Sequence, residues 1–141
     1  ADADQRRALV VGKLAACGIT PTPQRVEIGI IVLLEPQHLS AEQVLAAVNE
    51  RDPVVSKATV YNTLGLFAAK GLVRELVIDS TKVFYDSNVS DHYHLYRVDT
   101  GQVEDLAQDA VRLATLPELA PGLSVEGVDI IIRVRGSGRG D

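Results

Sequence analysis

Apolar residues in the first half of the chain recur at intervals of three and four, the spacing that places them on one face of an α-helix. The first such stretch covers residues 5–16 and is followed by Gly18, a residue type that favours helix ends. Thr22 and Pro23 supply an N-cap and a first-turn proline for a second helix, which Pro36 ends. The pattern therefore predicts two helices before residue 36.

The same signals predict two further helices. Ser40 and Gln43 form a capping box at the start of one, and Ser56 is the N-cap of the other, which Gly71 closes. The buried stripe of this last helix is expected to consist of Val60, Leu64 and Phe67.

After Gly71 the apolar period changes from helical to alternating. Residues 72–78 and 82–85 are β-rich runs joined by a short polar turn, which predicts a β-hairpin. Several helices followed by a hairpin is the element order of a winged helix-turn-helix domain, which we expect over residues 1–86.

The rest of the chain predicts a smaller α/β unit over residues 87–134, so that the fold class is α+β. Its expected elements are strands at 94–98, 103–106 and 128–134 and a helix at 106–116. About fifty residues are marginal for an independent core, so we expect a dimerisation domain completed by a second copy of the chain. The composition of residues 135–141 predicts a flexible tail.

The composition is that of an ordinary globular protein, with 46% hydrophobic residues, 23% charged residues and a formal net charge of -5. The single cysteine, Cys17, allows neither an intrachain disulfide nor a cysteine-rich zinc site. The longest uncharged apolar run, residues 28–34, is far shorter than the roughly 20 residues that cross a bilayer. The first residues also lack the apolar stretch of a signal peptide. We therefore expect a soluble, cytoplasmic protein without a membrane partner.

Lys57, Tyr61 and Asn62 are predicted to face solvent on the last helix, opposite its apolar stripe. In the major groove of double-stranded DNA an asparagine can pair with an adenine edge, and an aromatic ring can touch a thymine methyl group. The first 86 residues carry 9 basic and 10 acidic side chains, a net charge of -1, and the remainder carries 5 and 9, a net charge of -4, so most of the net negative charge lies outside this half. The alternative is that Tyr61 is a packing residue and that the helix reads no DNA.

Two histidines, His92 and His94, are two residues apart, and in an extended segment both imidazoles project from one side. Further donors are Asp86 at the end of the hairpin, Asp105 after the next turn, and His38 in the loop before the third helix. Three imidazoles and two carboxylates without a thiolate suit Fe(II), Mn(II) or Zn(II). The alternative is that the histidines are solvated surface residues and that Asp86 is a turn residue.

Four segments resemble, in order and spacing, the ferric uptake regulator (Fur) family. They read TPQR at 22–25, HLSAE at 38–42, ATVYNTL at 58–64 and SDHYHL at 90–95. The resemblance implies a metal-dependent repressor, not an enzyme, that binds operator DNA as a homodimer through an N-terminal winged helix. By the same resemblance, the expected DNA-binding residues are Arg25, Ser56, Lys57, Thr59, Tyr61 and Asn62.

Within the family the sequence is most similar to the peroxide-stress repressors, which also have an asparagine after the recognition-helix tyrosine. This resemblance implies that a regulatory Fe(II) or Mn(II) binds to five residues, and that Zn(II) can bind in vitro. These residues are His38, Asp86, His92, His94 and Asp105. It also implies that bound Fe(II) reacts with hydrogen peroxide and that a ligand histidine, His38 or His92, is oxidised. Loss of that ligand would release the DNA.

The chain departs from most of the family at the structural zinc. Arg97 and Thr100 occupy the positions of the first Cys-x-x-Cys pair, so we expect no structural zinc. Iron response regulators share this lack, which leaves an iron- or haem-responsive regulator as the alternative function. A non-haem iron oxygenase, which also uses two histidines and a carboxylate, and a metal-independent winged-helix protein are the remaining alternatives.

Overall fold

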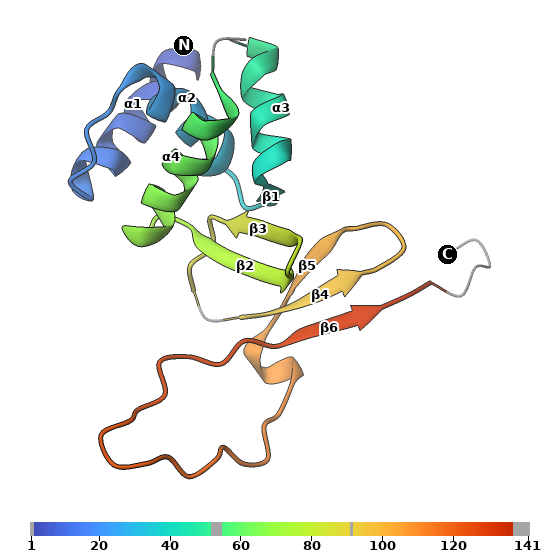
Figure 1. The fold of residues 1–141 in the computed structure, drawn as a ribbon. Coiled ribbons are helices and arrows are strands. Elements are labelled where there is room, and N and C mark those ends of the chain that lie inside the picture. The colour runs from blue at the N-terminus through green and yellow to red at the C-terminus, as the bar shows by residue number, and fades with distance from the viewer. Residues whose placement is uncertain (1, 52–54, 91, 137–141) are drawn as a thin grey trace. The chain divides into compact units, whose positions relative to one another are not determined.

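The computed structural model describes residues 2–51, 55–90 and 92–136 (Figure 1). The chain divides into two compact units, Ala1–Val89 and Ser90–Asp141. Of the predicted tail, residues 137–141 lie outside the described residues. No helix in the described ranges is both long enough and apolar enough to cross a membrane.

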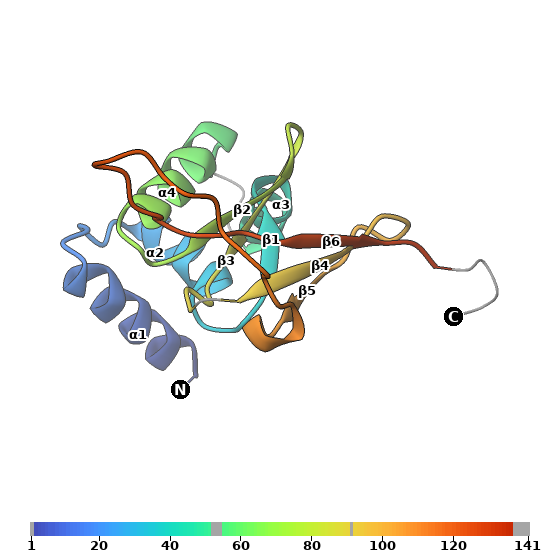
Figure 2. The same ribbon diagram turned by 90° about the horizontal axis from the view of Figure 1, so that it is seen from below.

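The first unit combines helices with a small antiparallel sheet, as Figures 1 and 2 show. In chain order its elements are α1 (Asp2–Ala16), α2 (Pro23–Val32), β1 (His38–Ser40), α3 (Ala41–Arg51), α4 (Lys57–Ala69), β2 (Arg74–Asp79) and β3 (Lys82–Asp86). The order of strands in the sheet is β1-β3-β2. The four predicted helices and the predicted hairpin are thereby confirmed.

Side-chain caps begin three of these helices. Thr22 is the N-cap of α2. At α3, the Ser40 backbone N–H donates to Gln43 Oε1 (2.9 Å) and the Gln43 backbone N–H donates to Ser40 Oγ (3.1 Å), which is the predicted capping box. At α4, Ser56 Oγ accepts from the backbone N–H of Thr59 (3.1 Å). Each cap satisfies a backbone donor that a helix start leaves unpaired, so these residues fix where the helices begin.

The core of the first unit includes all three residues of the stripe predicted for α4, since Val60, Leu64 and Phe67 are completely buried. Removing such side chains from water contributes about 1.5–3 kcal/mol each. Val10 of α1 is also completely buried and lies so close to Gly29 of α2 that a Cβ on that glycine would be 2.5 Å from Val10 Cγ1. The absence of a side chain at Gly29 therefore lets the two helices pack closely.

The prediction that His38 lies in a loop is wrong, because residues His38–Ser40 form strand β1. This strand pairs antiparallel with β3, with His38 opposite Asp86 and Ser40 opposite Phe84. A three-residue strand has no readable alternation of its own, and only its pairing with residues more than forty positions later makes it a strand.

The second unit is built around a sheet with the strand order β5-β4-β6. Its elements are β4 (Tyr93–Arg97), β5 (Val103–Leu106), a 3-10 turn at Gln108–Ala110, and β6 (Ile131–Val134). Strand β4 pairs antiparallel with β5 and parallel with β6. Gly101, in the turn between β4 and β5, has a φ of 79°, a left-handed conformation that glycine adopts without strain.

The helix predicted at 106–116 is not formed. Leu106 ends strand β5, where it pairs with Tyr93, and residues 111–130 contain neither helix nor strand. Short helices depend on tertiary packing of their apolar face, and Leu113 and Leu116 are exposed, with nothing in this unit covering them. The strand predicted at 128–134 begins only at Ile131, because that residue is the first to find a partner on β4.

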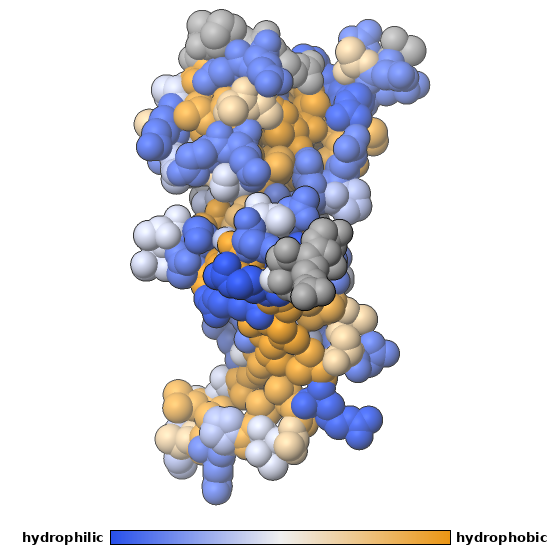
Figure 3. Space-filling view, turned by 90° about the vertical axis from the view of Figure 1, so that its right-hand side faces the viewer, coloured by the Kyte–Doolittle hydropathy of each residue, from blue (hydrophilic) through white to orange (hydrophobic). Residues whose placement is uncertain are grey.

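Few apolar side chains of the second unit are buried. Among its described residues only Tyr93 and Tyr96 count as buried hydrophobic residues. The exposed large ones are Leu113, Leu116, Leu119, Leu123, Val125 and Ile132. Apolar surface is correspondingly extensive in the lower part of the space-filling view (Figure 3). A unit with so little buried apolar surface has little stabilisation of its own.

Candidate metal centre and nucleic-acid interface

His38 and Asp86 form a pair in the first unit, which we call the N-terminal half-site. They stand opposite each other on β1 and β3, and residues opposed across antiparallel strands place their side chains on one face. His38 Nε2 lies 2.9 Å from Asp86 Oδ2. The other carboxylate oxygen, Asp86 Oδ1, accepts from the backbone N–H of Asn88 (2.9 Å). The half-site thus offers one imidazole nitrogen and one oriented carboxylate oxygen.

His92, His94 and Asp105 form a second group, the C-terminal half-site. His94 is opposite Asp105 on β4 and β5, and His92 immediately precedes β4. Asp105 Oδ1 lies 3.0 Å from His92 Nε2 and 3.6 Å from His94 Nε2. The two imidazole rings are 4.5 Å apart at an angle of 60°. Both imidazoles therefore direct Nε2 toward the same carboxylate oxygen.

The orientation of His92 is fixed from its other side. Its Nδ1 lies 2.6 Å from the carbonyl oxygen of Ser90. Because a carbonyl oxygen only accepts, Nδ1 is the nitrogen that donates a proton in this contact, and Nε2 is the nitrogen left to bind a metal ion. This is the arrangement that metal-binding histidines usually have.

The donor atoms of both half-sites fit a divalent transition metal. The C-terminal half-site contributes two nitrogens and one oxygen, with ligand atoms of its three residues within 4.8 Å of one another. The N-terminal half-site contributes one nitrogen and one oxygen. Imidazoles with carboxylates and no thiolate suit iron, manganese or zinc. Each of the five predicted ligands is thus in one of the two half-sites, whereas Cys17 is in neither.

The predicted solvent-facing side of helix α4 is confirmed, because Lys57, Tyr61 and Asn62 are all exposed. Ser56 and Thr59 are engaged with each other at the start of this helix, where Ser56 Oγ donates to Thr59 Oγ1 (2.9 Å) and also caps the Thr59 backbone N–H. These two residues fix the helix start that presents the exposed residues.

Arg25 is engaged in the turn before α2. Its guanidinium Nη1 donates to the carbonyl oxygen of Thr20 (3.0 Å), and its backbone N–H donates to the hydroxyl of Thr22 (3.4 Å). Arg25 therefore stabilises this turn, and its expected contact with DNA stays a prediction.

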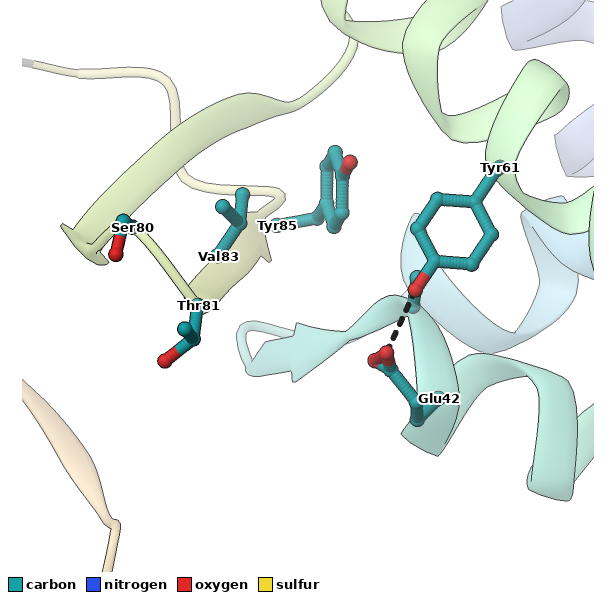
Figure 4. Close-up of a pocket in the computed structure, with 7 residues that line it drawn as sticks. Glu42, Tyr61, Ser80, Thr81, Val83 and Tyr85 are labelled. Carbon is teal, nitrogen blue, oxygen red and sulfur yellow. Dashed lines mark hydrogen bonds between the residues drawn. The ribbon is translucent and has the colours of Figure 1, made fainter.

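One contact of helix α4 was not predicted from the sequence. The Tyr61 hydroxyl donates to Glu42 Oε1 of α3 at 2.6 Å (Figure 4). This hydrogen bond is the main cause that lowers the pKa of the Glu42 carboxyl, and it is also the main cause that raises the pKa of the Tyr61 phenol. The two residues are 19 positions apart, so no local spacing signals their contact.

A cavity of about 160 Å³ adjoins this contact. Figure 4 shows that its walls come from α3, α4 and the hairpin of β2 and β3. It is lined by Ala41, Glu42, Tyr61, Ser80, Thr81, Val83 and Tyr85. Burial is the main cause that raises the pKa of Tyr85, which therefore stays neutral at physiological pH. Four of these seven lining residues carry a hydroxyl group.

Comparison with known sequences finds one matching family model and individual relatives. A sequence model described as the ferric uptake regulator family matches residues 16–130. The peroxide-responsive repressor PerR of Staphylococcus epidermidis is 30% identical to this chain over 95 residues, which are 67% of this chain and 63% of that protein. The chain thus spans less than two thirds of the length of the curated relatives it matches first.

Solved structures share the fold. The ferric uptake regulator of Pseudomonas aeruginosa with manganese has a TM-score of 0.66 at 28% identity, covering 91% of this chain and 98% of that one. The ferric uptake regulator of Vibrio cholerae has a TM-score of 0.68 at 22% identity, covering 89% and 98%. The α+β architecture therefore matches that of solved family structures.

Proposed function

The chain belongs to the ferric uptake regulator family, and we propose that it is a metal-dependent repressor that binds operator DNA as a homodimer. The observation that carries this proposal is that each unit holds a half-site of imidazole and carboxylate donors. The family consists of transcriptional regulators rather than enzymes, which argues against the oxygenase alternative.

Each half-site alone is incomplete for a tightly held ion. The N-terminal half-site has two donors and the C-terminal half-site has three, whereas Fe(II) and Mn(II) favour higher coordination by nitrogen and oxygen. We therefore propose that one ion takes all five ligands. Because the ligands belong to different units, a bound ion would restrict the two units to one relative orientation, and this orientation would be the one that fits DNA.

The neighbouring hydrogen bonds prepare the ligands for this role. Asn88 holds one oxygen of Asp86 and leaves the other directed toward His38. The Ser90 carbonyl keeps the proton of His92 on Nδ1 and leaves Nε2 available. Partners of this kind orient metal ligands and typically contribute 10- to 100-fold in metal affinity.

Within the family we propose a peroxide-responsive repressor. The similarity to PerR proteins and the presence of a residue at every expected ligand position support this subtype. In this proposal Fe(II), when bound, supplies the reactivity toward hydrogen peroxide. His38 and His92 would be the residues oxidised, and each belongs to a different half-site. Modification of either imidazole would remove a nitrogen donor and with it the constraint between the units.

Dimerisation would complete the second unit. Its exposed leucines leave a large apolar surface in contact with water, and a second copy of the chain is the proposed partner that covers it. Such burial would stabilise the unit without a structural zinc, which we still expect to be absent.

The proposal is tested with the full chain loaded either with Mn(II) or, without oxygen, with Fe(II). Each form is used to select binders from a random-sequence DNA duplex pool, and affinity for the enriched duplex is then measured by fluorescence anisotropy. We expect specific binding in both forms, and loss of binding after low peroxide in the Fe(II) form only. Peptide mass spectrometry should then find added oxygen on His38 or His92.

Three results would contradict parts of the proposal. If no sequence is enriched, the protein is not a specific DNA-binding regulator. If the Fe(II) form keeps its affinity after peroxide and both histidines stay unmodified, peroxide sensing is wrong. If haem instead binds stoichiometrically and abolishes DNA binding, the haem-responsive alternative replaces it.

A further inference from the structure

Tyr61 makes two side-chain interactions although it lies on the exposed face of helix α4. Its hydroxyl donates to Glu42 Oε1 at 2.6 Å, and the ammonium group of Lys57 lies 5.7 Å from the centre of its ring. A cation at this distance from an aromatic ring is attracted to the ring face. We call these three residues the tyrosine clamp: Glu42, Lys57 and Tyr61.

A carboxylate at this position is unfavourable for a surface that binds DNA. Glu42 is exposed in the first turn of α3, close to the recognition helix that carries Tyr61. A fixed negative charge there repels the phosphate backbone and lowers affinity for every sequence. Its hydrogen bond to Tyr61 gives this carboxylate a function that offsets the repulsion.

The tyrosine clamp also determines which part of the Tyr61 side chain can contact a base. Because the hydroxyl is bonded to Glu42, it is not available to donate to a phosphate or to a base edge. The part of the side chain that stays accessible is the aromatic ring, and 39% of the residue is exposed. Aromatic rings contact the methyl group of thymine in the major groove.

We propose that Glu42 is a positioning residue that holds Tyr61 with its ring toward the major groove, and that this arrangement selects thymine at the base pair below it. The inference rests on the proposed function, since it concerns the same DNA-binding surface. The neighbouring cavity leaves space beside the ring, and Ser80 and Thr81 of the hairpin bound this space on the far side (Figure 4). Holding the ring before DNA arrives removes the cost of ordering it on binding.

The decisive comparison is between Glu42→Gln and Glu42→Ala in the Mn(II)-loaded full chain. Both variants remove the negative charge, but only glutamine keeps an oxygen that can accept from the Tyr61 hydroxyl. Any effect of charge on phosphate repulsion or on the start of α3 is therefore common to both. Glu50→Ala is the matched control, because Glu50 is an exposed carboxylate on the same helix.

Binding is measured on the duplex enriched by the unmodified chain and on duplexes in which each base pair is replaced in turn. We expect Glu42→Ala to lower the ratio of specific to non-specific affinity about fivefold, the size of effect that loss of one positioned side chain produces. The loss of affinity should be confined to the base pair at which the unmodified chain prefers thymine. Glu42→Gln should keep at least half of the unmodified chain's preference for thymine at that base pair. Glu50→Ala should raise affinity for all duplexes alike.

A second measurement tests the clamp without DNA. Tyrosine carrying ¹³C at Cζ gives one NMR signal for each of the four tyrosines, and Tyr61→Phe identifies the signal of Tyr61. We expect this signal to move in Glu42→Ala and to stay near its original position in Glu42→Gln. Circular dichroism of each variant confirms that the helices are retained.

The outcomes separate this inference from the proposed function. If the Tyr61 signal is the same in Glu42→Ala and in the unmodified chain, or if both Glu42 variants discriminate equally, the positioning role is wrong while the regulator can still bind DNA. If the unmodified chain enriches no sequence, the proposed function fails, and a clamp seen by NMR alone would then have only a structural role.

Discussion

Replacing Asp105 by alanine is the sharpest test of the C-terminal half-site. Asp105 Oδ1 lies 3.0 Å from His92 Nε2 and 3.6 Å from His94 Nε2, so one oxygen atom interacts with both imidazoles. The substitution removes a proposed metal ligand together with the group that orients the other two. The Asp105 side chain is 39% exposed, so its removal leaves no sealed cavity, and we expect the variant to fold.

The expected magnitude follows from these contacts. Loss of one group that orients a metal ligand costs about 10- to 100-fold in metal affinity, and Asp105 orients two, so we expect about 100-fold. At a Mn(II) concentration about 1,000 times the Kd of the unmodified chain, binding stabilises the folded state by about 4.1 kcal/mol. The same concentration would stabilise the variant by about 1.4 kcal/mol, a loss of about 2.7 kcal/mol.

Isothermal titration calorimetry with Mn(II) measures the affinity, and chemical denaturation with and without Mn(II) measures the stabilisation. Asp109→Ala is the control, because Asp109 is an exposed carboxylate four residues further along the same unit. The reasoning is refuted if Asp105→Ala binds Mn(II) within about threefold of the unmodified chain, or if Asp109→Ala loses as much affinity, since either result assigns no specific role to this carboxylate.

Three further predictions concern the first unit. Gly29→Ala should lower the free energy of unfolding by about 1–3 kcal/mol, because the new Cβ would lie 2.5 Å from Val10 Cγ1. An unchanged free energy of unfolding in chemical denaturation would mean that α1 and α2 can move apart without destabilising the protein. Ser56→Ala should lower it by about 1 kcal/mol, because the cap of α4 is lost, and an unaltered denaturation midpoint would contradict this. The hydrogen bond from Tyr61 holds the pKa of the Glu42 carboxyl below its ordinary value of 4.5. The stabilisation of the folded state by this bond is therefore complete above pH 4.5 and is lost as the pH falls through the lowered pKa. Glu42→Gln should therefore make the stability less dependent on pH in the acid range, and identical acid profiles in denaturation experiments would argue against the bond.

Much of the first unit is encoded locally, which is why the sequence predicts it well. The caps at Thr22, Ser40 and Ser56 act on backbone groups three residues away, and the stripe of α4 follows from the helical repeat alone. The choice of histidine and carboxylate donors is also visible in the sequence, because residue types define the metals that they suit.

Pairing between segments that are distant in the sequence determines the features that the sequence did not predict. His38 belongs to a strand only because β3 lies beside it, and that register is what brings Asp86 opposite its ring. The sequence around Leu106 has helical spacing, but pairing with Tyr93 makes that residue the end of a strand. An antiparallel register can pair residues at any separation along the chain, so it cannot be predicted from a short stretch of neighbouring residues.

Helix α4 combines both kinds of information. By itself the sequence determined that Lys57, Tyr61 and Asn62 face outward, since a period of 3.6 residues fixes the faces of a helix once its buried stripe is known. Only the tertiary structure decided that Tyr61 donates its hydroxyl to Glu42, because that contact depends on how α3 packs against α4. The direction of a side chain on an exposed face is set by neighbours that are close in space and distant in sequence.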